Sequence, residues 1–436
     1  MENVQDERSR AMSKAEFETV NIAENIRLHR LQSDQFKTNT LAVLIEQELS
    51  EEKVTKTALL PAVLQRGTVS YPTTIRLKRQ LDELYGAGLS GDVFKRGERH
   101  MIQFVFDLAN GNYLQEKPPL LEKGIAFLGE ILFSPVLEEG IFKADYVEAE
   151  KNNLKQRIKS LQDDKIRYAA KRLTEEMCKN EPYALHAYGR LSDIETIDAS
   201  ILYTYYQDVL RHCPIDLYLV GEVDFDATME LLEQQFFARL PKGERKPRNR
   251  VTVAPNEHNE QVVIDRLDVK QGKLNIGCRT HTTIEDEAYP ALLLYNGILG
   301  GFAHSKLFMN VREKASLAYY CSSRIESHKG LLSIQSGIEI RHYEQALSII
   351  KEQLKEMQEG KISDQELDKT KATLINQFRE RLDSAYGLID LHHHSALSTR
   401  NWPLPELLER IQATTREDVQ QVAEKVTIDT IYFLRD

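Results

Sequence analysis

The chain has 436 residues, of which 41% are hydrophobic and 28% are charged, and its formal net charge is −10. This composition is typical of a globular protein, and the length exceeds what one hydrophobic core usually organises, so we expect at least two domains. Lys and Arg are spread along an acidic chain, which argues against a nucleic-acid partner, and no apolar run approaches the roughly 18 residues of a membrane-spanning helix.

The first half of the sequence predicts a mixture of strands and helices. Apolar and β-branched residues indicate a strand at 36–49, and a stripe of Ile and Leu at helical spacing indicates a helix within 73–91. Further along we expect a strand pair around Gly97, a helix ending before Pro135, a long charged helical region at 144–178, a helix at 199–210 and a strand at 214–224.

The same order of elements returns after a stretch at 241–261 that is rich in Pro and basic residues and has no periodicity. The later elements are a strand at 271–280, a helix at 288–301, a helix-and-strand segment at 305–339, helices at 344–360, 362–388 and 415–426, and a strand at 429–436. We therefore predict two homologous halves, 1–240 and 262–436, joined by a linker at 241–261.

The cysteines and the N-terminus bear on the compartment. Cys178, Cys213, Cys278 and Cys321 form no C-x-x-C pair and match no usual zinc spacing, as expected for buried thiols in a reducing environment. Residues 1–20 are charged throughout and contain no apolar region of the kind found in a secretory signal. We expect a cytoplasmic protein.

A segment of the second half, ILGGFAHSKLFMNVREKASLAYY (298–320), resembles the C-terminal domain of the insulinase-like zinc peptidases, the family of pitrilysin and mitochondrial processing peptidase. The family writes this region roughly as L-G-G-G-x-x-S-R-L-F-x-x-[VL]-R-E-x-x-x-L-A-Y. Lys306 replaces the usual Arg and Phe302 replaces a Gly. The resemblance implies an α+β fold of two homologous domains, each a mostly antiparallel sheet with helices packed on one face.

The family's zinc motif is missing from the corresponding helix. Active members carry H-x-x-E-H on a first-domain helix that runs into LFKGT. Aligning VLQRGT (63–68) with that ending places Ala58 and Ala62 at the histidine positions and Pro61 at the glutamate position. These side chains supply neither a metal ligand nor a general base. Because proline lacks an N–H, we also expect this helix to start later or to bend.

The family's further glutamate ligand is also replaced. It lies in a helix resembling E-[KR]-x-x-[VL]-x-x-E-I, and EKNNLKQRI (150–158) places Arg157 at that position. A guanidinium would repel a metal ion. The only histidine cluster, at 392–394, puts consecutive side chains in different directions on a helix, so we interpret it as a partly exposed polar surface. We expect this chain to bind no metal or other cofactor.

Arg312 and Tyr319 match an R-x₆-Y pair that, in active members, reaches the substrate backbone beside the zinc. A planar guanidinium and a phenolic O–H suit a peptide carbonyl and the negative charge that develops on its oxygen. The resemblance therefore implies that both residues bind substrate. The alternative is structural: Arg312 pairs with Glu313 or another acid, and Tyr319 packs within a strand.

The resemblance implies a function divided between two chains. In some members one chain carries the zinc motif, and a second lacks it but supplies the R-x₆-Y pair. We expect a non-catalytic, substrate-contacting subunit of a heteromeric zinc endopeptidase, paired with a zinc-bearing relative and acting on peptides; alone it could form a homodimer. The alternatives are a scaffold subunit with no role in cleavage and a self-sufficient peptidase with an unrecognised metal site. One bacterial branch of such pairs is linked to elongation factor P modification, and the resemblance makes this chain a candidate member of that branch.

Overall fold

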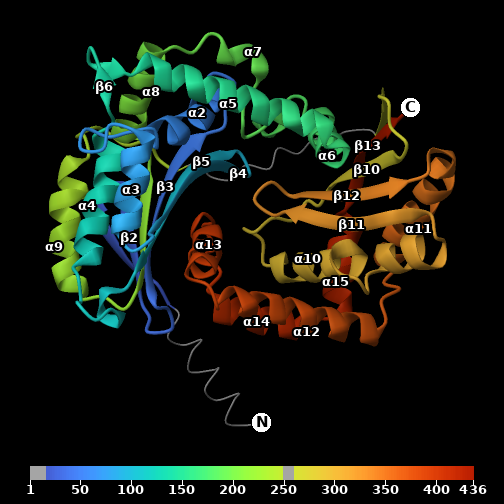
Figure 1. Ribbon diagram of the computed structural model, residues 1–436. Coiled ribbons are helices and arrows are strands. Elements are labelled where there is room, and N and C mark those ends of the chain that lie inside the picture. Colours follow the sequence, from blue (N-terminus) through green and yellow to red (C-terminus); the bar gives the residue numbers. More distant parts are fainter. Residues whose placement is uncertain (1–15, 249–259) are drawn as a thin grey trace.

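A computed structural model describes residues 16–248 and 260–436 and contains two β-sheets, each accompanied by helices (Figure 1). The first sheet has six strands in the order β1-β2-β8-β3-β5-β4, and the second has five in the order β11-β12-β10-β13-β9. Neighbouring strands are antiparallel except for the parallel pairs β2–β8 and β9–β13. The predicted α+β fold with mostly antiparallel sheets is confirmed.

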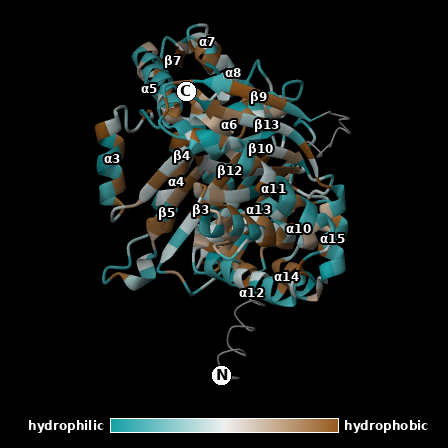
Figure 2. Cartoon of the chain, turned by 90° about the vertical axis from the view of Figure 1, so that its right-hand side faces the viewer, coloured by the Kyte–Doolittle hydropathy of each residue, from teal (hydrophilic) through white to brown (hydrophobic). Residues whose placement is uncertain are grey.

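The first half supplies all strands of the six-stranded sheet. They are β1 (Glu18–Ala23), β2 (Ile26–Gln32), β3 (Thr38–Glu48), β4 (Gly88–Arg96), β5 (Arg99–Ala109) and β8 (Ile215–Gly221), with a separate small pair β6 (Leu137–Glu138) and β7 (Ile141–Phe142). Its helices are α2 (Val54–Leu64), α3 (Thr74–Glu83), α4 (Leu120–Phe133), α5 (Ala144–Asp163), α6 (Lys165–Met177), α7 (Leu191–Ile194), α8 (Ala199–His212) and α9 (Phe225–Gln235). Among them, α3 lies at the periphery of the molecule (Figure 2).

The second half supplies the five-stranded sheet. Its strands are β9 (Gln261–Arg266), β10 (Gly272–Arg279), β11 (Ala318–Glu326), β12 (Leu331–Ile338) and β13 (Thr427–Arg435). Its helices are α10 (Tyr289–Asn296), α11 (Tyr343–Gln358), α12 (Asp364–Arg381), α13 (Ala385–Ala396), α14 (Leu404–Ala413) and α15 (Arg416–Lys425). Over residues 16–248 and 260–436, no helix is both long enough and apolar enough to cross a bilayer.

Strand for strand, the second sheet repeats the first. The order β9-β13-β10-β12-β11, with one parallel pair and three antiparallel pairs, matches β2-β8-β3-β5-β4. This repetition agrees with the two-half organisation predicted from the element order. The boundaries at 240 and 262 stay predictions, and 249–259 of the predicted linker lie outside the described residues.

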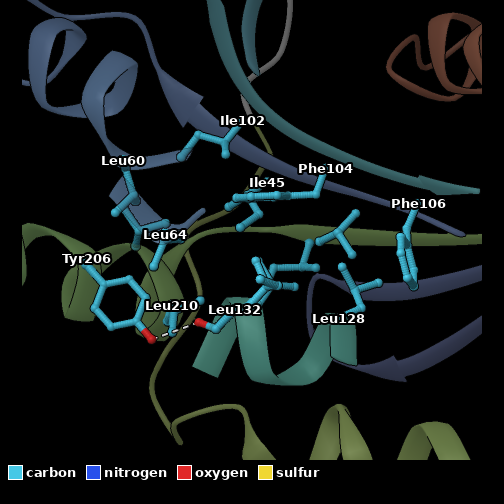
Figure 3. Packing of buried hydrophobic residues seen from close by; sticks show 14 of the residues in the cluster. Ile45, Leu60, Leu64, Ile102, Phe104, Phe106, Leu128, Leu132, Tyr206 and Leu210 are labelled. Carbon is cyan, nitrogen blue, oxygen red and sulfur yellow. Dashed lines mark hydrogen bonds between the residues drawn. The ribbon is translucent and has the colours of Figure 1, made fainter. Parts of the chain in front are cut away.

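The central strand β3 shows how each sheet is buried on both faces. Leu41, Val43 and Ile45 point to one face, where they join the large core formed with α2, α4 and α8 (Figure 3). The Tyr206 hydroxyl of α8 donates to the Leu132 carbonyl of α4 at 2.7 Å in this core. Ala42 and Leu44 point to the opposite face and belong to a separate cluster. The alternation of side chains along a strand produces this division.

The opposite face of each sheet is covered by a helix from the other half of the chain. Helix α13, from the second half, packs on β3 and β8, where its Ala385, Leu388 and Ile389 contact the smaller cluster of the first sheet. Helix α6, from the first half, packs on β10 and β13, where Ala169 and Leu173 contact the second sheet (Figure 1). The two halves therefore exchange one helix each.

Three predicted helices differ from expectation, and one of them, 362–388, spans α12, a break at 382–384 and the start of α13. The prediction of a later start for the helix containing Pro61 is wrong, because α2 begins at Val54 and includes Pro61. Burial of its apolar side chains, such as Leu59 and Leu60, offsets the cost of proline, about 3 kcal/mol in a helix interior. The long charged region at 144–178 is two helices, α5 and α6, because the Asp164 side chain caps α6 by accepting from the backbone N–H groups of Ile166 and Arg167.

Of the histidines at 392–394, interpreted as a partly exposed polar surface, the outer two are half-buried, but all three lie at an internal junction rather than on an open surface. They lie on α13, where His393 is buried and the flanking histidines are bonded at the junction of the two halves. The Tyr218 hydroxyl lies 3.0 Å from His392 Nδ1, and His328 Nε2 lies 3.1 Å from His394 Nδ1. Burial lowers the pKa of His392 and that of His394 to about 3. Both imidazoles are therefore neutral at pH 7.

We predict that the chain loses stability as the pH falls from 6.5 to 5. A buried imidazole with a folded-state pKa near 3 and an ordinary value of 6.5 stabilises the fold fully above pH 6.5 and progressively less below it. Each such imidazole contributes a slope of up to about 1.4 kcal/mol per pH unit. Urea unfolding at several pH values measures this slope. The substitution His392→Leu should flatten it, and an unchanged free energy of unfolding between pH 7 and 5 would contradict the prediction.

Candidate functional site

The helix that would carry the zinc motif is intact but lacks ligands. Ala58 and Pro61 are buried in α2 and Ala62 is half-buried. The helix packs against α5 and β4, the elements around the predicted site. The Gln65 side-chain amide donates to the Pro61 carbonyl at 2.8 Å and reaches the Gly91 carbonyl of β4 at 3.5 Å. The amide thus ties the end of α2 to the edge strand β4.

Arg157, predicted to replace the family's glutamate ligand, is held on α5 by two neighbours. Its guanidinium donates to both carboxylate oxygens of Asp92 in β4, at 3.1 and 2.7 Å, and lies 3.9 Å from the centre of the Tyr188 ring. Burial alone would lower the pKa of Arg157, but the bonds to Asp92 raise it above its ordinary value. A permanent positive charge therefore sits beside β4, next to the end of α2.

No cation site replaces the lost motif among the described residues. Within 16–248 and 260–436, no three His, Cys, Asp or Glu side chains gather in an arrangement that could hold a metal ion. The positions assigned to the motif carry Ala58, Pro61, Ala62 and Arg157, whose side chains have no lone pair suited to a metal. The assignment of these four positions to the family's motif stays a prediction.

Arg312 and Tyr319 lie in the second half, on either side of a sharp change of chain direction. Arg312 belongs to a π-helical segment, Phe308–Lys314, and Tyr319 belongs to the edge strand β11. Ser316, at a φ of 52°, turns the chain between them, and the Leu317 N–H donates to the Val311 carbonyl at 3.1 Å. The pair is thus held by backbone geometry rather than by a regular element.

The strand that carries Tyr319 is irregular at that residue. Ala318 pairs with Ile338 and Tyr320 with Gly337, so the register shifts and Tyr319 faces no residue of β12. Such a bulge redirects a side chain and recurs near functional sites. The Tyr319 side chain is 67% exposed, which contradicts the alternative that it packs within the strand.

Arg312 is also accessible, but it has neighbours of its own. Its side chain is 43% exposed, its Nε lies 3.7 Å from Glu313 Oε1, and its guanidinium lies 4.6 Å from the centre of the Phe308 ring. The alternative that Arg312 pairs with Glu313 therefore describes part of its surroundings. At 3.7 Å an exposed pair is weak, at roughly 0–1 kcal/mol, and leaves most guanidinium donors for another partner.

The structure does not join the two predicted sets of residues into one cluster. The lost-motif positions belong to the first half and the Arg312–Tyr319 pair to the second, and no hydrogen bond or ion pair connects them among the described side chains. Sequence reasoning missed Asp92 and Tyr188, which hold Arg157. The Asp92–Arg157 contact joins residues 65 positions apart, so no local pattern could have revealed it.

Comparison with known proteins gives consistent matches over the chain. Residues 196–374 match the family described as "Peptidase M16 inactive domain". The Bacillus subtilis protein "Probable inactive metalloprotease YmfF" is 47% identical over 411 residues, 93% of this chain and 95% of that protein. Another B. subtilis protein, "Uncharacterized zinc protease YmxG", is 23% identical over 69% of this chain and 71% of its own. A conserved protein from Enterococcus faecalis V583 shares the fold, with 32% identity, a TM-score of 0.85 and coverage of 96% and 98% of the two chains.

We predict that restoring the motif on α2 alone will not create a zinc site. The combined substitution Ala58→His, Pro61→Glu and Ala62→His leaves the Arg157 cation beside the new ligands, so zinc content after dialysis should stay well below one ion per chain. Adding Arg157→Glu removes that charge and supplies a carboxylate, and zinc content should rise toward one ion per chain. Metal analysis measures both proteins. Stoichiometric zinc in the triple variant would show that Arg157 does not oppose the metal.

Proposed function

The chain belongs to the M16 peptidase family, the insulinase-like family expected from residues 298–320, and on that premise we propose that it is the non-catalytic, substrate-contacting subunit of a heteromeric zinc endopeptidase. The chain is an inactive-type member, since it matches the family's inactive domain and is 47% identical to a relative named a probable inactive metalloprotease. Beyond this family membership, we propose a zinc-bearing partner chain and a role for this chain in holding the substrate.

The observation that carries the proposal is the contrast between the two predicted sites. Where the family needs metal ligands, this chain has Ala58, Pro61, Ala62 and a guanidinium already bonded to Asp92. Where the family needs substrate donors, Arg312 and Tyr319 are both present and exposed. A chain that has lost catalysis but displays these donors fits a subunit that holds a peptide for another chain.

The donors suit the chemistry of peptide hydrolysis. A zinc-bound water in the partner would attack the scissile carbonyl, and negative charge would develop on its oxygen. The Arg312 guanidinium and the Tyr319 O–H are hydrogen-bond donors that can stabilise this charge, and within the described residues no hydrogen bond engages the Tyr319 hydroxyl. Their contribution is greatest in the transition state, so it would appear in turnover.

The partner we propose is an M16 relative that retains H-x-x-E-H and carries the zinc, with peptides as substrates and the cytoplasm as the compartment. A stable interface of this kind should bury at least about 1,000 Å². In the absence of the partner, the chain could pair with a second copy of itself. The link of one bacterial branch to elongation factor P modification stays a prediction, since no residue described above bears on it.

The second candidate is a scaffold subunit with no role in cleavage. One observation favours it: Glu313 and Phe308 already surround Arg312, so this residue has a structural explanation that requires no substrate. Tyr319 has no comparable explanation, because its side chain is largely exposed at the bulge of β11. The two candidates therefore differ most at Tyr319.

We predict that the chain forms a stable complex with a motif-bearing relative encoded in the same genome. Co-expression followed by size-exclusion chromatography should give one peak containing both chains at micromolar concentration, with about one zinc per pair. An unrelated protein of similar size, from outside the M16 family, serves as the control for nonspecific association. Elution of the two chains as separate peaks would count against a dedicated pair.

We further predict that Arg312→Ala and Tyr319→Phe each lower peptide cleavage by the assembled pair by a factor of roughly 10² to 10³, the usual cost of removing one oxyanion donor. Assembly and zinc content should not change, since both side chains are exposed. The substitution Tyr319→Phe keeps the ring, so a loss of activity reports the hydroxyl.

An exposed arginine and an exposed tyrosine elsewhere in the chain provide matched controls for these variants. Arg341 has a 76% exposed side chain and Tyr85 is 51% exposed, and neither belongs to the predicted pair. Arg341→Ala and Tyr85→Phe should therefore leave cleavage unchanged. Wild-type cleavage by both Arg312→Ala and Tyr319→Phe would favour the scaffold subunit instead.

A further inference from the structure

A separate pocket is lined by residues of α12, α13 and α14, together with Glu16 and Phe17 at the start of the described chain. Its volume is about 280 Å³, and none of the residues assigned to the lost zinc motif or to the Arg312–Tyr319 pair lines it. Its walls are predominantly apolar and aromatic, and they include Phe17, Tyr289, Phe378, Leu388, Trp402 and Leu404. This combination of an apolar lining and a small volume is typical of a small-molecule site.

Two imidazoles line the pocket, beside the polar residues Ser395, Asn401 and Glu16. His392 is bonded through one nitrogen, whereas both nitrogens of His394 are bonded. His392 Nδ1 lies 3.0 Å from the Tyr218 hydroxyl, and His394 Nε2 lies 3.2 Å from the Tyr289 hydroxyl. Burial holds the pKa of each imidazole near 3, so both are uncharged at neutral pH. Within the described residues, no hydrogen bond engages His392 Nε2, and this nitrogen remains available to a bound molecule.

The pocket offers no counter-ion for an anionic ligand, and its one carboxylate lies at the solvent-exposed edge. Of the residues that line it, Glu16 alone carries a charge, and Glu16 is exposed. A sulfonate or carboxylate entering between neutral walls would lose its hydration without gaining a partner, which costs several kcal/mol. The charges nearest to α13, such as the Arg96–Asp390 ion pair, are already matched and lie outside the lining.

We propose that this pocket binds a small, uncharged aromatic molecule. Four aromatic side chains, Phe17, Tyr289, Phe378 and Trp402, present ring faces and edges that favour a planar aromatic ligand over a flexible aliphatic one. His392 supplies one polar contact that orients it. The Trp402 indole is itself fixed, since its Nε1–H donates to the Ile284 carbonyl at 2.7 Å.

Occupancy of this pocket would stabilise the junction of the two halves. One wall is α13, the helix that the second half lends to the first sheet, and another is α14. A ligand that contacts both helices binds only while α13 is in place, so it should raise the free energy of unfolding by mass action. A bound ligand would thereby stabilise the packing of α13 on the first sheet.

The test uses the full chain and a matched pair of probes. N-phenyl-1-naphthylamine is uncharged, and 8-anilinonaphthalene-1-sulfonate has the same rings with a sulfonate added. Trp402 is the only tryptophan of the chain and lines the pocket, so energy transfer from its indole detects a probe bound within range of it. The leucine substitutions below then assign that signal to the pocket. We expect saturable binding of one uncharged probe per chain, with the sulfonate at least about tenfold weaker.

Two leucine substitutions complete the test. Leu391 lines the pocket, and Leu391→Phe should fill part of it and weaken the uncharged probe at least about tenfold. Leu347 is equally half-buried on α11 and does not line the pocket, so Leu347→Phe should leave binding unchanged. Urea unfolding checks that both variants are folded.

Four outcomes would overturn the proposal. They are the absence of saturable energy transfer, equal affinity for the two probes, equal effects of Leu391→Phe and Leu347→Phe, and binding that appears only after residues 1–15 are removed. The last result would mean that the chain itself fills the pocket.

Discussion

The reciprocal packing of α6 and α13 holds the two halves of this protein together. Each helix leaves the half that encodes it and covers the open face of the other sheet. Because that face of each sheet is apolar, neither half can bury it with the packing of its own helices on the opposite face. The relative position of the halves therefore depends on hydrophobic burial that each half supplies to the other.

Buried charges make the same junction specific. Glu181 accepts from Arg279 and lies 2.6 Å from Lys329, which also reaches Glu98 at 2.5 Å. Burial alone would raise the pKa of Glu181, but Arg279 and Lys329 outweigh it, and the carboxylate stays charged. Removing one member of such a network leaves another charge buried without its partner, which costs about 3–5 kcal/mol. A closely fitted turn accompanies the network: Gly97 has a φ of 54°, and a side-chain carbon there would lie 2.9 Å from the His328 carbonyl.

The helices and strands around the predicted zinc-motif positions form a regular, well-packed framework. Helix α2 packs on α5 and β4, and the positions predicted to correspond to the ligands carry small or apolar side chains compatible with burial. Arg157, predicted to stand at the remaining ligand position, is held by Asp92 and Tyr188, and its positive charge would oppose a metal ion there. In the second half, by contrast, the π-helical segment and the bulge of β11 keep Arg312 and Tyr319 accessible. These irregularities cost regular hydrogen bonding, and features of this kind recur near functional sites.

The sequence by itself determined the family, the α+β class, the repeated order of elements and the absence of ligands at Ala58, Pro61, Ala62 and Arg157. These features depend on residue identity and on local periodicity, which a single chain displays directly. Only the tertiary structure decided that α6 and α13 each pack on the sheet of the other half. It also decided that His392 and His394 are hydrogen-bonded and neutral, and that Tyr319 points outward at a bulge. Each of these depends on contacts between residues distant in the chain. Tyr218 and His392, for example, are 174 positions apart. Three consecutive histidines are polar, so the sequence alone predicts that they face solvent, and only the position of the first sheet shows that they lie at an internal junction instead. Local pattern sets which elements form, whereas burial depends on which surfaces those elements meet.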